Sequence, residues 1–299
     1  HSIEDRRRSV VSKREHPGRL REASPMSDPG VRAVERKIIR YRGGTGEVKS
    51  DSITVEEPLE IRVDGTSVAV VMRTPGDDLD LTRGFLLTEG LVKQPSDIFE
   101  ISQCPSQESV TGIGNVVDVL LTNPSTVDLK SLSRNVYTSS SCGICGRATL
   151  ESVFQQFPPI ESDLAINPII IGTLSDKLRN AQQTFAQTGG LHASALFDTE
   201  GNLLLLREDV GRHNALDKVI GKEWQAGNTP MGDRLLLVSG RVSFELMQKA
   251  LCAGIPFVVG ISAPSSLAID CAKEGNQTLI GFLRGETMNV YAHAERLLS

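Results

Sequence analysis

The chain of 299 residues has the length of one or two domains, and 39% of its residues are hydrophobic, which is enough to build a sizeable core. Its 32 Lys and Arg against 37 Asp and Glu give a formal net charge of −5, which argues against broad binding to nucleic acid or to membrane surfaces. No run approaches the roughly 18 apolar residues that a membrane helix needs. We therefore expect a cytoplasmic protein with no nucleic-acid or membrane partner.

The first part of the chain divides into a tail and a mixed unit. Residues 1–26 are polar and basic, without the apolar stretch of a secretory signal, and are expected to form a disordered basic tail. Residues 27–135 are predicted to be an α+β domain. Its expected elements are a strand over 53–65, a turn at Asp64–Gly65, a strand over 66–74, a helix over 77–92 and strands over 98–102 and 115–122.

Residues 136–299 are more regular and are predicted to form a second, α/β domain. Its first elements are expected to be helices over 147–157 and 175–187, a hairpin of 191–197 with 202–209, and a helix over 214–221. Then strands over 234–240, 256–262 and 278–283 alternate with helices over 243–254 and 265–275. Ser243 and Ser265 stand at N-cap positions. Continuous apolar strands separated by helices indicate a parallel sheet covered on both faces.

Two glycine-rich segments are better explained as turns than as phosphate loops. Residues 43–50 nearly match a P-loop, but Val48 stands where the second Gly is needed and a strand pattern follows instead of a helix. Gly112 and Gly114 lack both a third Gly and a following helix.

The five cysteines are sparse and odd in number, which indicates a reducing compartment rather than a disulfide framework: Cys104, Cys142, Cys145, Cys252 and Cys271. Cys142 and Cys145 form a C-x-x-C pair flanked by glycines, after a Ser/Thr-rich stretch and before Arg147. A helix beginning near Arg147 favours thiolate, the nucleophilic form of cysteine. Sulfur handling by a reactive thiolate is the preferred interpretation. A structural zinc site, for which the other ligands are missing, and a thioredoxin-like redox pair are weaker alternatives, and no metal is predicted.

A second polar cluster is expected around residues 188–192 and 207–218. Both charge signs alternate densely there beside a predicted helix start, and His192, Asp209, Arg212 and His213 are its candidate site residues. A solvated helix surface would have a similar pattern, so this cluster indicates a polar site without assigning a role to each residue.

The third candidate lies where the predicted parallel strands end. In such sheets ligands bind beyond the carboxyl ends of the strands. The segments at these ends are Ser239–Gly240–Arg241, residues 262–265 and residues 284–287. They are small, polar or basic, and they predict a phosphate-binding edge with Arg241 and Arg284 as charge partners.

Five segments, SCGICGR, TGGLHASAL, REDVGRHNALDKVIG, SGRVSFELMQKA and GFLRGETMNVY, occur in this order. Together they closely resemble the FdhD/NarQ family of formate dehydrogenase accessory sulfurtransferases, over most of the chain from about residue 31. The resemblance implies that the second domain has a three-layer fold similar to cytidine deaminases. Zinc deaminases use H-x-E with the Glu as general acid and base, whereas this chain has Ser194 two residues after His192. Because serine is no proton shuttle of that kind, deaminase chemistry is not expected.

The resemblance also implies an activity, a cargo and partners. The protein would take persulfide sulfur from a cysteine desulfurase on Cys142, with Cys145 assisting, for example as a resolving thiol. It would pass the sulfur to the molybdenum cofactor, as bis-molybdopterin guanine dinucleotide, before insertion into the catalytic subunit of formate dehydrogenase. The cofactor-binding segment maps onto Phe282, Leu283, Arg284, Gly285, Glu286 and Thr287, and a homodimer is implied. The alternative is a non-enzymatic chaperone that holds the cofactor, with a structural metal or disulfide at the cysteine pair.

Overall fold

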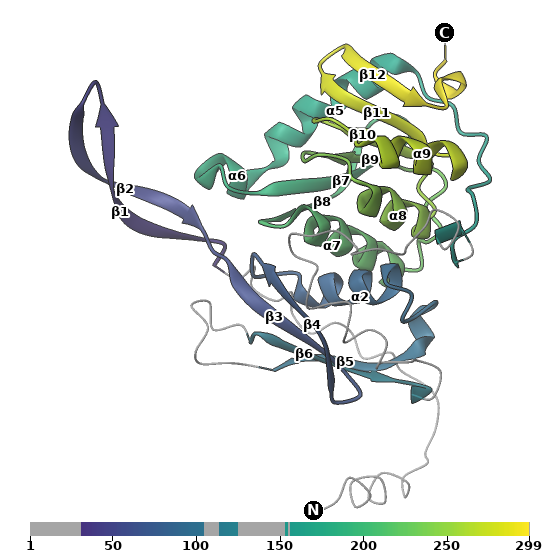
Figure 1. The fold of residues 1–299 in the computed structure, drawn as a ribbon, viewed down its shortest axis with the longest axis horizontal. Helices are drawn as coiled ribbons and strands as arrows, with labels where there is room; N and C mark the ends of the chain where they lie inside the picture. Colours follow the sequence, from purple (N-terminus) through teal and green to yellow (C-terminus); the bar gives the residue numbers. More distant parts are fainter. Residues whose placement is uncertain (1–30, 105–113, 125–152, 155, 299) are drawn as a thin grey trace, which may run out of the picture.

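A computed structural model describes residues 31–104, 114–124, 153–154 and 156–298, and it contains three sheets (Figure 1). The predicted cysteine pair Cys142 and Cys145 lies outside the described residues, as does the expected tail. Of the predicted helix over 147–157, residues 147–152 and 155 also lie outside them, and residues 153, 154 and 156 are helical. Among the described helices, none is both long and apolar enough to cross a membrane.

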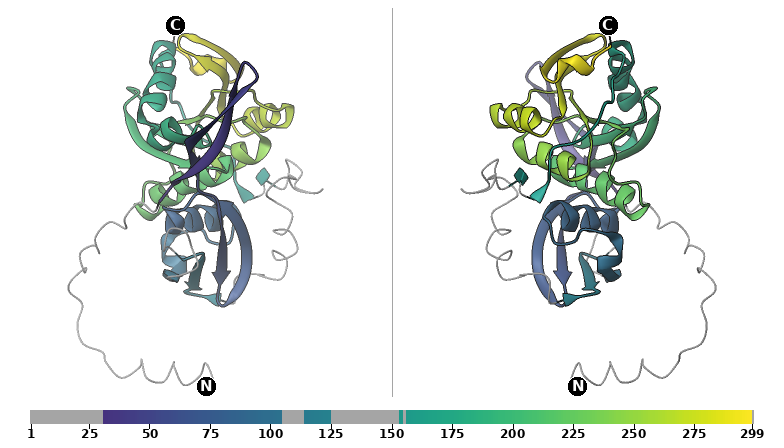
Figure 2. Two further views of the ribbon diagram at one scale, coloured as in Figure 1. Left: turned by 90° about the vertical axis from the view of Figure 1, so that its left-hand side faces the viewer. Right: turned by 90° about the vertical axis from the view of Figure 1, so that its right-hand side faces the viewer.

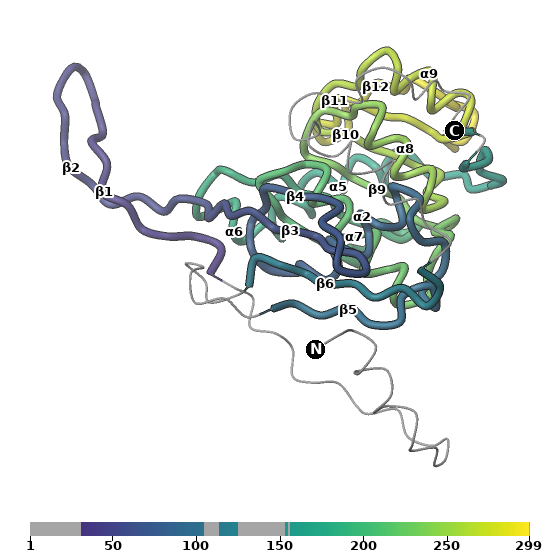
Figure 3. The backbone as a smooth tube through the Cα atoms, turned by 60° about the horizontal axis from the view of Figure 1, so that its bottom comes forward, coloured from purple at the N-terminus to yellow at the C-terminus, as the bar shows by residue number. Residues whose placement is uncertain are grey.

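The first two strands form a hairpin that the sequence did not predict. β1 (Ala33–Arg42) pairs antiparallel with β2 (Thr45–Thr54), and the pair extends away from the rest of the molecule (Figures 1 and 3). Gly43 and Gly44, at φ 54° and 86°, make the turn between these strands, so the near match to a P-loop is a hairpin turn. The expected strand over 53–65 was wrong at its start, because Ile53 and Thr54 end β2 and a new strand begins at Glu57.

A four-stranded sheet follows, in the order β4–β3–β6–β5. Its strands are β3 (Glu57–Val63), β4 (Thr66–Arg73), β5 (Ile98–Cys104) and β6 (Val116–Leu121), with a 3-10 turn at Pro95–Asp97. The predicted turn at Asp64–Gly65 is confirmed, with both residues at positive φ as a tight hairpin turn requires. The helix predicted over 77–92 is α2 (Asp78–Thr88). It covers one face of this sheet, and its buried apolar residues belong to the same core as those of the strands.

The six-stranded sheet has the order β12–β11–β10–β9–β7–β8. Its strands are β7 (His192–Phe197), β8 (Leu203–Asp209), β9 (Leu235–Val238), β10 (Phe257–Gly260), β11 (Thr278–Arg284) and β12 (Thr287–Ala292). The predicted parallel sheet is confirmed in its centre, where β9, β10 and β11 run parallel, while β7, β8 and β12 run antiparallel to their neighbours. β12 was not predicted. It pairs with β11 because the glycine turn at Gly285 reverses the chain.

Helices cover both faces of this sheet, as predicted (Figure 2). One face packs against α5 (Pro168–Ala181), with α6 (Gln183–Thr188) following it. The other face packs against α7 (Arg212–Gln225), α8 (Phe244–Cys252) and α9 (Ser266–Glu274). A 3-10 turn at Ala294–Arg296 closes the chain. The fold is therefore mixed α/β, and the apolar residues of α2, α7 and α8 form one continuous core that joins the two sheets.

Two predicted helices have different bounds. The helix expected over 175–187 begins earlier, where Asn167 caps α5 by accepting a hydrogen bond from the Ile169 amide, and it is interrupted at Gln182. The interruption frees the first amides of α6, and Glu208 of β8 accepts hydrogen bonds from two of them. The short helix expected over 214–221 is the longer α7, because Gly211 is its N-cap and Arg212 begins the helix.

Candidate functional site

One edge of the six-stranded sheet collects most of the predicted site residues. β9 and β10 end at this edge, and because β7 is antiparallel to β9 and β8 to β7, β7 begins there and β8 ends there. The loops that leave β9 and β10 are joined by backbone hydrogen bonds, from the Val242 amide to Ala263 and from the Ser265 amide to Val242. The register of the sheet therefore fixes the spacing of these segments.

His192 begins β7 at this edge, beside the predicted residues Gly240 and Arg212. A Cβ on Gly240 would lie 3.2 Å from His192 Nδ1 and 3.5 Å from Arg212 Cβ, so glycine allows this close approach. Burial, together with the guanidinium of Arg212, lowers the pKa of His192. The imidazole is therefore neutral at pH 7 and has both a donor and an acceptor nitrogen. The Ser239 hydroxyl accepts a hydrogen bond from the Ala193 amide at 2.9 Å, which holds the oxygen in place and leaves the O–H able to donate.

His213 contacts a group from the next helix. Its Nε2 lies 3.1 Å from Glu245 Oε2 and 3.5 Å from the Ser243 hydroxyl. Hydrogen bonding to His213 lowers the pKa of Glu245, which stays ionised. Ser243 stands at the N-cap of α8 as predicted, but its side chain makes no cap hydrogen bond there; the hydroxyl donates instead to Glu245 at 3.2 Å. Ser265 does cap α9, accepting from the Ala268 amide.

Asp209 is a supporting residue. It is fully buried, its carboxylate lies 2.7 Å from Lys218 Nζ, and it accepts hydrogen bonds from the Thr74 and Gly211 amides. Lys218 also donates to the Thr74 carbonyl. This pair fixes the start of α7, and with it Arg212, against Thr74, the residue directly after β4.

The segment after β10 and β11 lies farther along the same edge. β11 is three strand spacings from β7, about 14 Å. Arg284 is exposed and its guanidinium donates to the Leu283 and Ile261 carbonyls, at the end of β10. Phe282 has φ 54° and is 44% exposed, whereas the Leu283 side chain is buried in the core below α5. Leu283 can therefore support a ligand only through its backbone.

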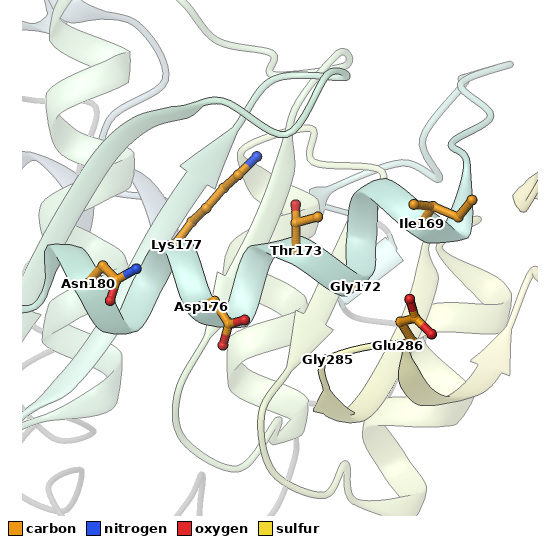
Figure 4. A pocket seen from close by; sticks show the side chains of 8 residues that line it. All are labelled: Ile169, Gly172, Thr173, Asp176, Lys177, Asn180, Gly285 and Glu286. Atoms are coloured by element: carbon orange, nitrogen blue, oxygen red, sulfur yellow. The ribbon is translucent and has the colours of Figure 1, made fainter.

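Gly285 and Glu286 form the turn before Thr287, which begins β12. They line a hollow of about 420 Å³ with α5, in which Gly172 approaches the turn and Asp176 and Lys177 lie on its wall (Figure 4). The structure thus brings Ser239, Gly240, Arg212 and His213 together, with Arg241 next to them in sequence, and places the 282–287 segment at the other end of the edge.

Three guanidinium groups follow this edge: Arg212, Arg241 and Arg284. With the neutral His192, they can neutralise and hydrogen-bond an elongated anion, such as a ligand with several phosphates. Sequence reasoning did not find Glu245. The one signal for it is its position two residues after an N-cap serine, where its carboxylate falls in the first turn of a helix.

The three described cysteines are all held as thiols. Burial raises the pKa of Cys252 and of Cys271 to about 12. Cys104 is exposed, and its hydrogen bond to the Asp118 carboxylate, at 3.2 Å, raises its pKa. None of these three is an activated thiolate. Within the described residues, no group of three or more His, Cys, Asp or Glu side chains is arranged to hold a metal ion.

Comparisons with known proteins agree on one family. The model of the FdhD/NarQ family matches residues 54–298. The sulfur carrier protein FdhD of Streptomyces avermitilis is 48% identical over 271 residues, covering 88% of this chain and 94% of that protein. The sulfur carrier protein FdhD of Mycobacterium tuberculosis is 46% identical over 277 residues, covering 90% and 99%. A crystal structure of a protein assigned as a formate dehydrogenase accessory protein, from Desulfotalea psychrophila, matches with a TM-score of 0.71 and 25% identity, covering 89% of this chain and 99% of that one.

Proposed function

Because this chain belongs to the FdhD/NarQ family, we propose that it is a sulfur carrier that serves formate dehydrogenase. Its donor is a cysteine desulfurase, and its acceptor is the molybdenum cofactor in its bis-molybdopterin guanine dinucleotide form, which is the cargo. The persulfide forms on Cys142, and the carrier works as a homodimer.

The observation that supports Cys142 as the sulfur-carrying thiol is that the described cysteines Cys104, Cys252 and Cys271 are held protonated. Only a thiolate attacks a persulfide at a useful rate, and Cys252 and Cys271, with pKa values of about 12, are almost entirely protonated at pH 7. The carboxylate of Asp118 opposes ionisation of Cys104 in the same way. The sequence context of Cys142 and Cys145, each followed by a glycine and both shortly before Arg147, favours the thiolate form.

Sulfur loading is a thiolate displacement. The Cys142 thiolate attacks the outer sulfur of the desulfurase persulfide, forms a Cys142 persulfide and releases the desulfurase thiolate, so no net oxidation occurs. For delivery, the Cys145 thiolate attacks the inner sulfur of that persulfide. This forms a Cys142–Cys145 disulfide and releases the outer sulfur as hydrosulfide for the metal, and a dithiol reductant then restores both thiols.

The strand-end edge is proposed to bind the cargo. Arg212 and Arg241 lie toward its β7 end and Arg284 toward its β11 end, and a dinucleotide is long enough to contact both. In this proposal the phosphates contact the guanidinium groups, and His192, neutral because of burial, supplies a hydrogen bond without adding charge. Phe282, whose ring is partly exposed, offers a stacking surface for a guanine base.

Sulfur loading is tested by mass spectrometry of the protein after incubation with a cysteine desulfurase and cysteine. We expect the mass of one added sulfur on the peptide that contains Cys142 and none after Cys142→Ala, while Cys104→Ala, which removes an exposed thiol, leaves loading intact. An adduct on Cys252 or Cys271 in place of Cys142 would contradict the proposal. Stoichiometric zinc, lost together with folding, would favour the chaperone with a structural metal site.

Cargo binding is tested separately with GDP as the probe. A ligand that binds only the folded state raises the melting temperature by mass action. We expect GDP at millimolar concentration to raise Tm, and Arg284→Ala to reduce the shift, while Arg234→Ala, which removes a half-buried arginine just before the start of β9, does not. An unchanged Tm, or an equal shift in Arg284→Ala, would exclude this edge as the nucleotide site.

A further inference from the structure

His213 of α7 and Glu245 of α8 form a hydrogen-bonded pair where these two helices begin. β8 and β9 both end at the sheet edge described above, and α7 and α8 follow them in the chain, so both helix starts lie at this edge. The two helices lie side by side on the same face of the sheet (Figure 1). The pair therefore stands next to Arg212, at the end of the edge where the cargo is proposed to bind.

The contacts of His213 leave one of its ring nitrogens available. Nε2 lies 3.1 Å from the Glu245 carboxylate and 3.5 Å from the Ser243 hydroxyl. That hydroxyl donates to the same carboxylate at 3.2 Å, so Glu245 is held from two sides. Among the described residues, none makes a hydrogen bond to Nδ1, and the side chain of His213 is 28% exposed. A carboxylate on one ring nitrogen fixes the orientation of an imidazole and leaves the other nitrogen free to transfer a proton.

The proposed delivery step needs a proton that neither cysteine provides. A persulfide is a stronger acid than a thiol, so the Cys142 persulfide is ionised at neutral pH, and its outer sulfur would have to leave as the sulfide dianion. The conjugate base of so weak an acid is a slow leaving group. A proton on the outer sulfur converts it to hydrosulfide, which leaves faster. Because the acceptor is proposed to lie at the sheet edge, the acid has to act there too.

Other groups of this edge are poor donors for that proton. The guanidinium of Arg212 does not lose its proton near neutral pH. Burial lowers the pKa of His192, so this ring is neutral at pH 7. Glu245 stays ionised, because its hydrogen bond to His213 lowers its pKa. Imidazole is the side chain that gains and loses a proton between pH 5 and 8, and the imidazole of His213 has a nitrogen to spare.

We propose that His213 is the general acid of sulfur delivery and that Glu245 is its positioning residue, an inference that rests on the proposed function. The Cys145 thiolate attacks the inner sulfur of the Cys142 persulfide while protonated His213 gives its Nδ1 proton to the outer sulfur. The bond between the two persulfide sulfurs breaks, and the outer sulfur leaves with its electron pair as hydrosulfide. The two cysteines become a disulfide and the imidazole becomes neutral, so two anions and one cation give one anion.

The charges around His213 act on the proton that it donates. Groups from its own helix, from β7, and from α8 with the loop before it surround the pair, and they are Arg212, His192, Arg241 and Glu245. Two buried ion pairs behind them carry no net charge, Asp209 with Lys218 and Asp217 with Lys249. Delivery should therefore slow at high pH as the imidazolium loses its proton, and at low pH as the attacking thiolate is protonated.

Hydrosulfide release in a single turnover tests the proposal. The carrier is loaded with sulfur by a cysteine desulfurase and cysteine, separated from both, and its release of hydrosulfide is followed between about pH 6 and about pH 9. For the wild type we expect the rate to pass through a maximum. His213→Gln should release hydrosulfide about 100-fold more slowly at pH 7 and lose the decrease at high pH, while loading on Cys142 stays intact. Imidazole in the buffer should restore part of the rate to His213→Ala, because it can donate the proton from solution.

Two further variants separate an acid from a structural contact. Glu245→Gln can still hydrogen-bond His213 but no longer holds the imidazolium with a charge, so release should slow about tenfold, less than in His213→Gln. The matched control is His293→Gln. The Nδ1 atom of His293 also lies 2.9 Å from a glutamate, Glu295, but this pair follows β12, at the sheet edge opposite to the site. Its release rate should equal that of the wild type.

The contrary results are distinct. Release from His213→Gln at the wild-type rate, or a high-pH decrease that persists in this variant, would show that His213 is not the acid. A loss of loading equal to the loss of release would make His213 a structural residue only. A slower release from Glu245→Gln than from His213→Gln would assign the proton to the carboxyl group instead. If the wild type takes up no sulfur on Cys142, the proposed function itself fails, and loading, measured before release, shows this separately.

Discussion

Gly84 of α2 and Gly221 of α7 allow these helices to cross at unusually close range. A Cβ at Gly84 would lie 1.9 Å from the Asp217 carbonyl oxygen, and one at Gly221 would lie 1.9 Å from the Asp80 carbonyl oxygen. Both atoms are backbone, so the contact cannot be relieved by a side-chain rotation. Gly84→Ala or Gly221→Ala must push the helices apart.

The size of the effect follows from this geometry. Restoring an ordinary contact of about 3.4 Å requires a separation of roughly 1.5 Å, and a helix crossing covers roughly 100 Å², given helix diameters near 10 Å. The resulting void of roughly 150 Å³ costs about 3–4 kcal/mol at about 24 cal/mol per Å³. Alanine recovers about 1 kcal/mol of helix propensity. We expect each variant to lower the free energy of unfolding by about 2–3 kcal/mol.

Urea denaturation followed by fluorescence measures this change, because the chain's single tryptophan, Trp224, is buried on α7. Gly172→Ala in α5 is the matched control: it gains the same helix propensity, and its Cβ would lie 3.2 Å from the nearest atom, a far smaller overlap. Its effect should stay within about 1 kcal/mol of zero. Equal or higher stability of Gly84→Ala and Gly221→Ala would refute the reasoning.

Three further predictions concern buried and titrating groups. The Lys249 ammonium lies 2.9 Å from the buried Asp217 carboxylate, so Lys249→Met leaves that carboxylate buried without a cation. Urea denaturation should show a free energy of unfolding lower by about 3–5 kcal/mol. Adding Asp217→Asn to this variant should restore much of the loss. The hydrogen bond to His213 lowers the pKa of Glu245 in the folded protein. The stability that this carboxylate contributes is therefore fully present above its unfolded pKa of about 4.3 and is lost as pH falls through the lower folded pKa. Glu245→Gln should reduce the loss of unfolding free energy on the acid side of a stability–pH profile, and an unchanged profile would contradict the pairing with His213. Iodoacetamide at pH 8 should leave Cys271 unmodified until urea unfolds the chain, because burial raises its pKa to about 12; mass spectrometry that finds it alkylated in the native protein would show otherwise.

The sequence predicted the elements whose pattern is local. The alternation of continuous apolar runs with capped helices was sufficient for the parallel centre of the six-stranded sheet. The Asp64–Gly65 pair was sufficient for its hairpin, because few residues tolerate positive φ at both positions. The strand-end rule also placed Gly240 and Arg241 at the edge where His192 and Arg212 now lie.

Other features were not predicted because they depend on contacts with distant residues or lack the buried face that gives a strand its sequence pattern. The hairpin of β1 and β2 alternates charged and apolar residues without a buried face, so its pattern does not resemble a strand packed on a core. Gln182 interrupts one expected helix because Glu208, a residue on a strand 26 positions later, binds the freed amides. Ser243 looks like a capping residue in the sequence, and its hydroxyl turns to Glu245 only because α8 begins beside His213.

The sequence by itself thus determined the family resemblance and the parallel centre of the six-stranded sheet, and it is the source of the proposal that the cysteine pair carries the sulfur. Only the tertiary structure decided which groups face each other: His192 with Arg212, His213 with Glu245, and Asp209 with Lys218. It also decided the sign of a glycine-to-alanine change in α2, which helix propensity alone would call stabilising. The physical reason is the same in each case. Propensity and periodicity act between residues a few positions apart, whereas burial, close approach and charge pairing depend on which distant segments the sheet register brings together.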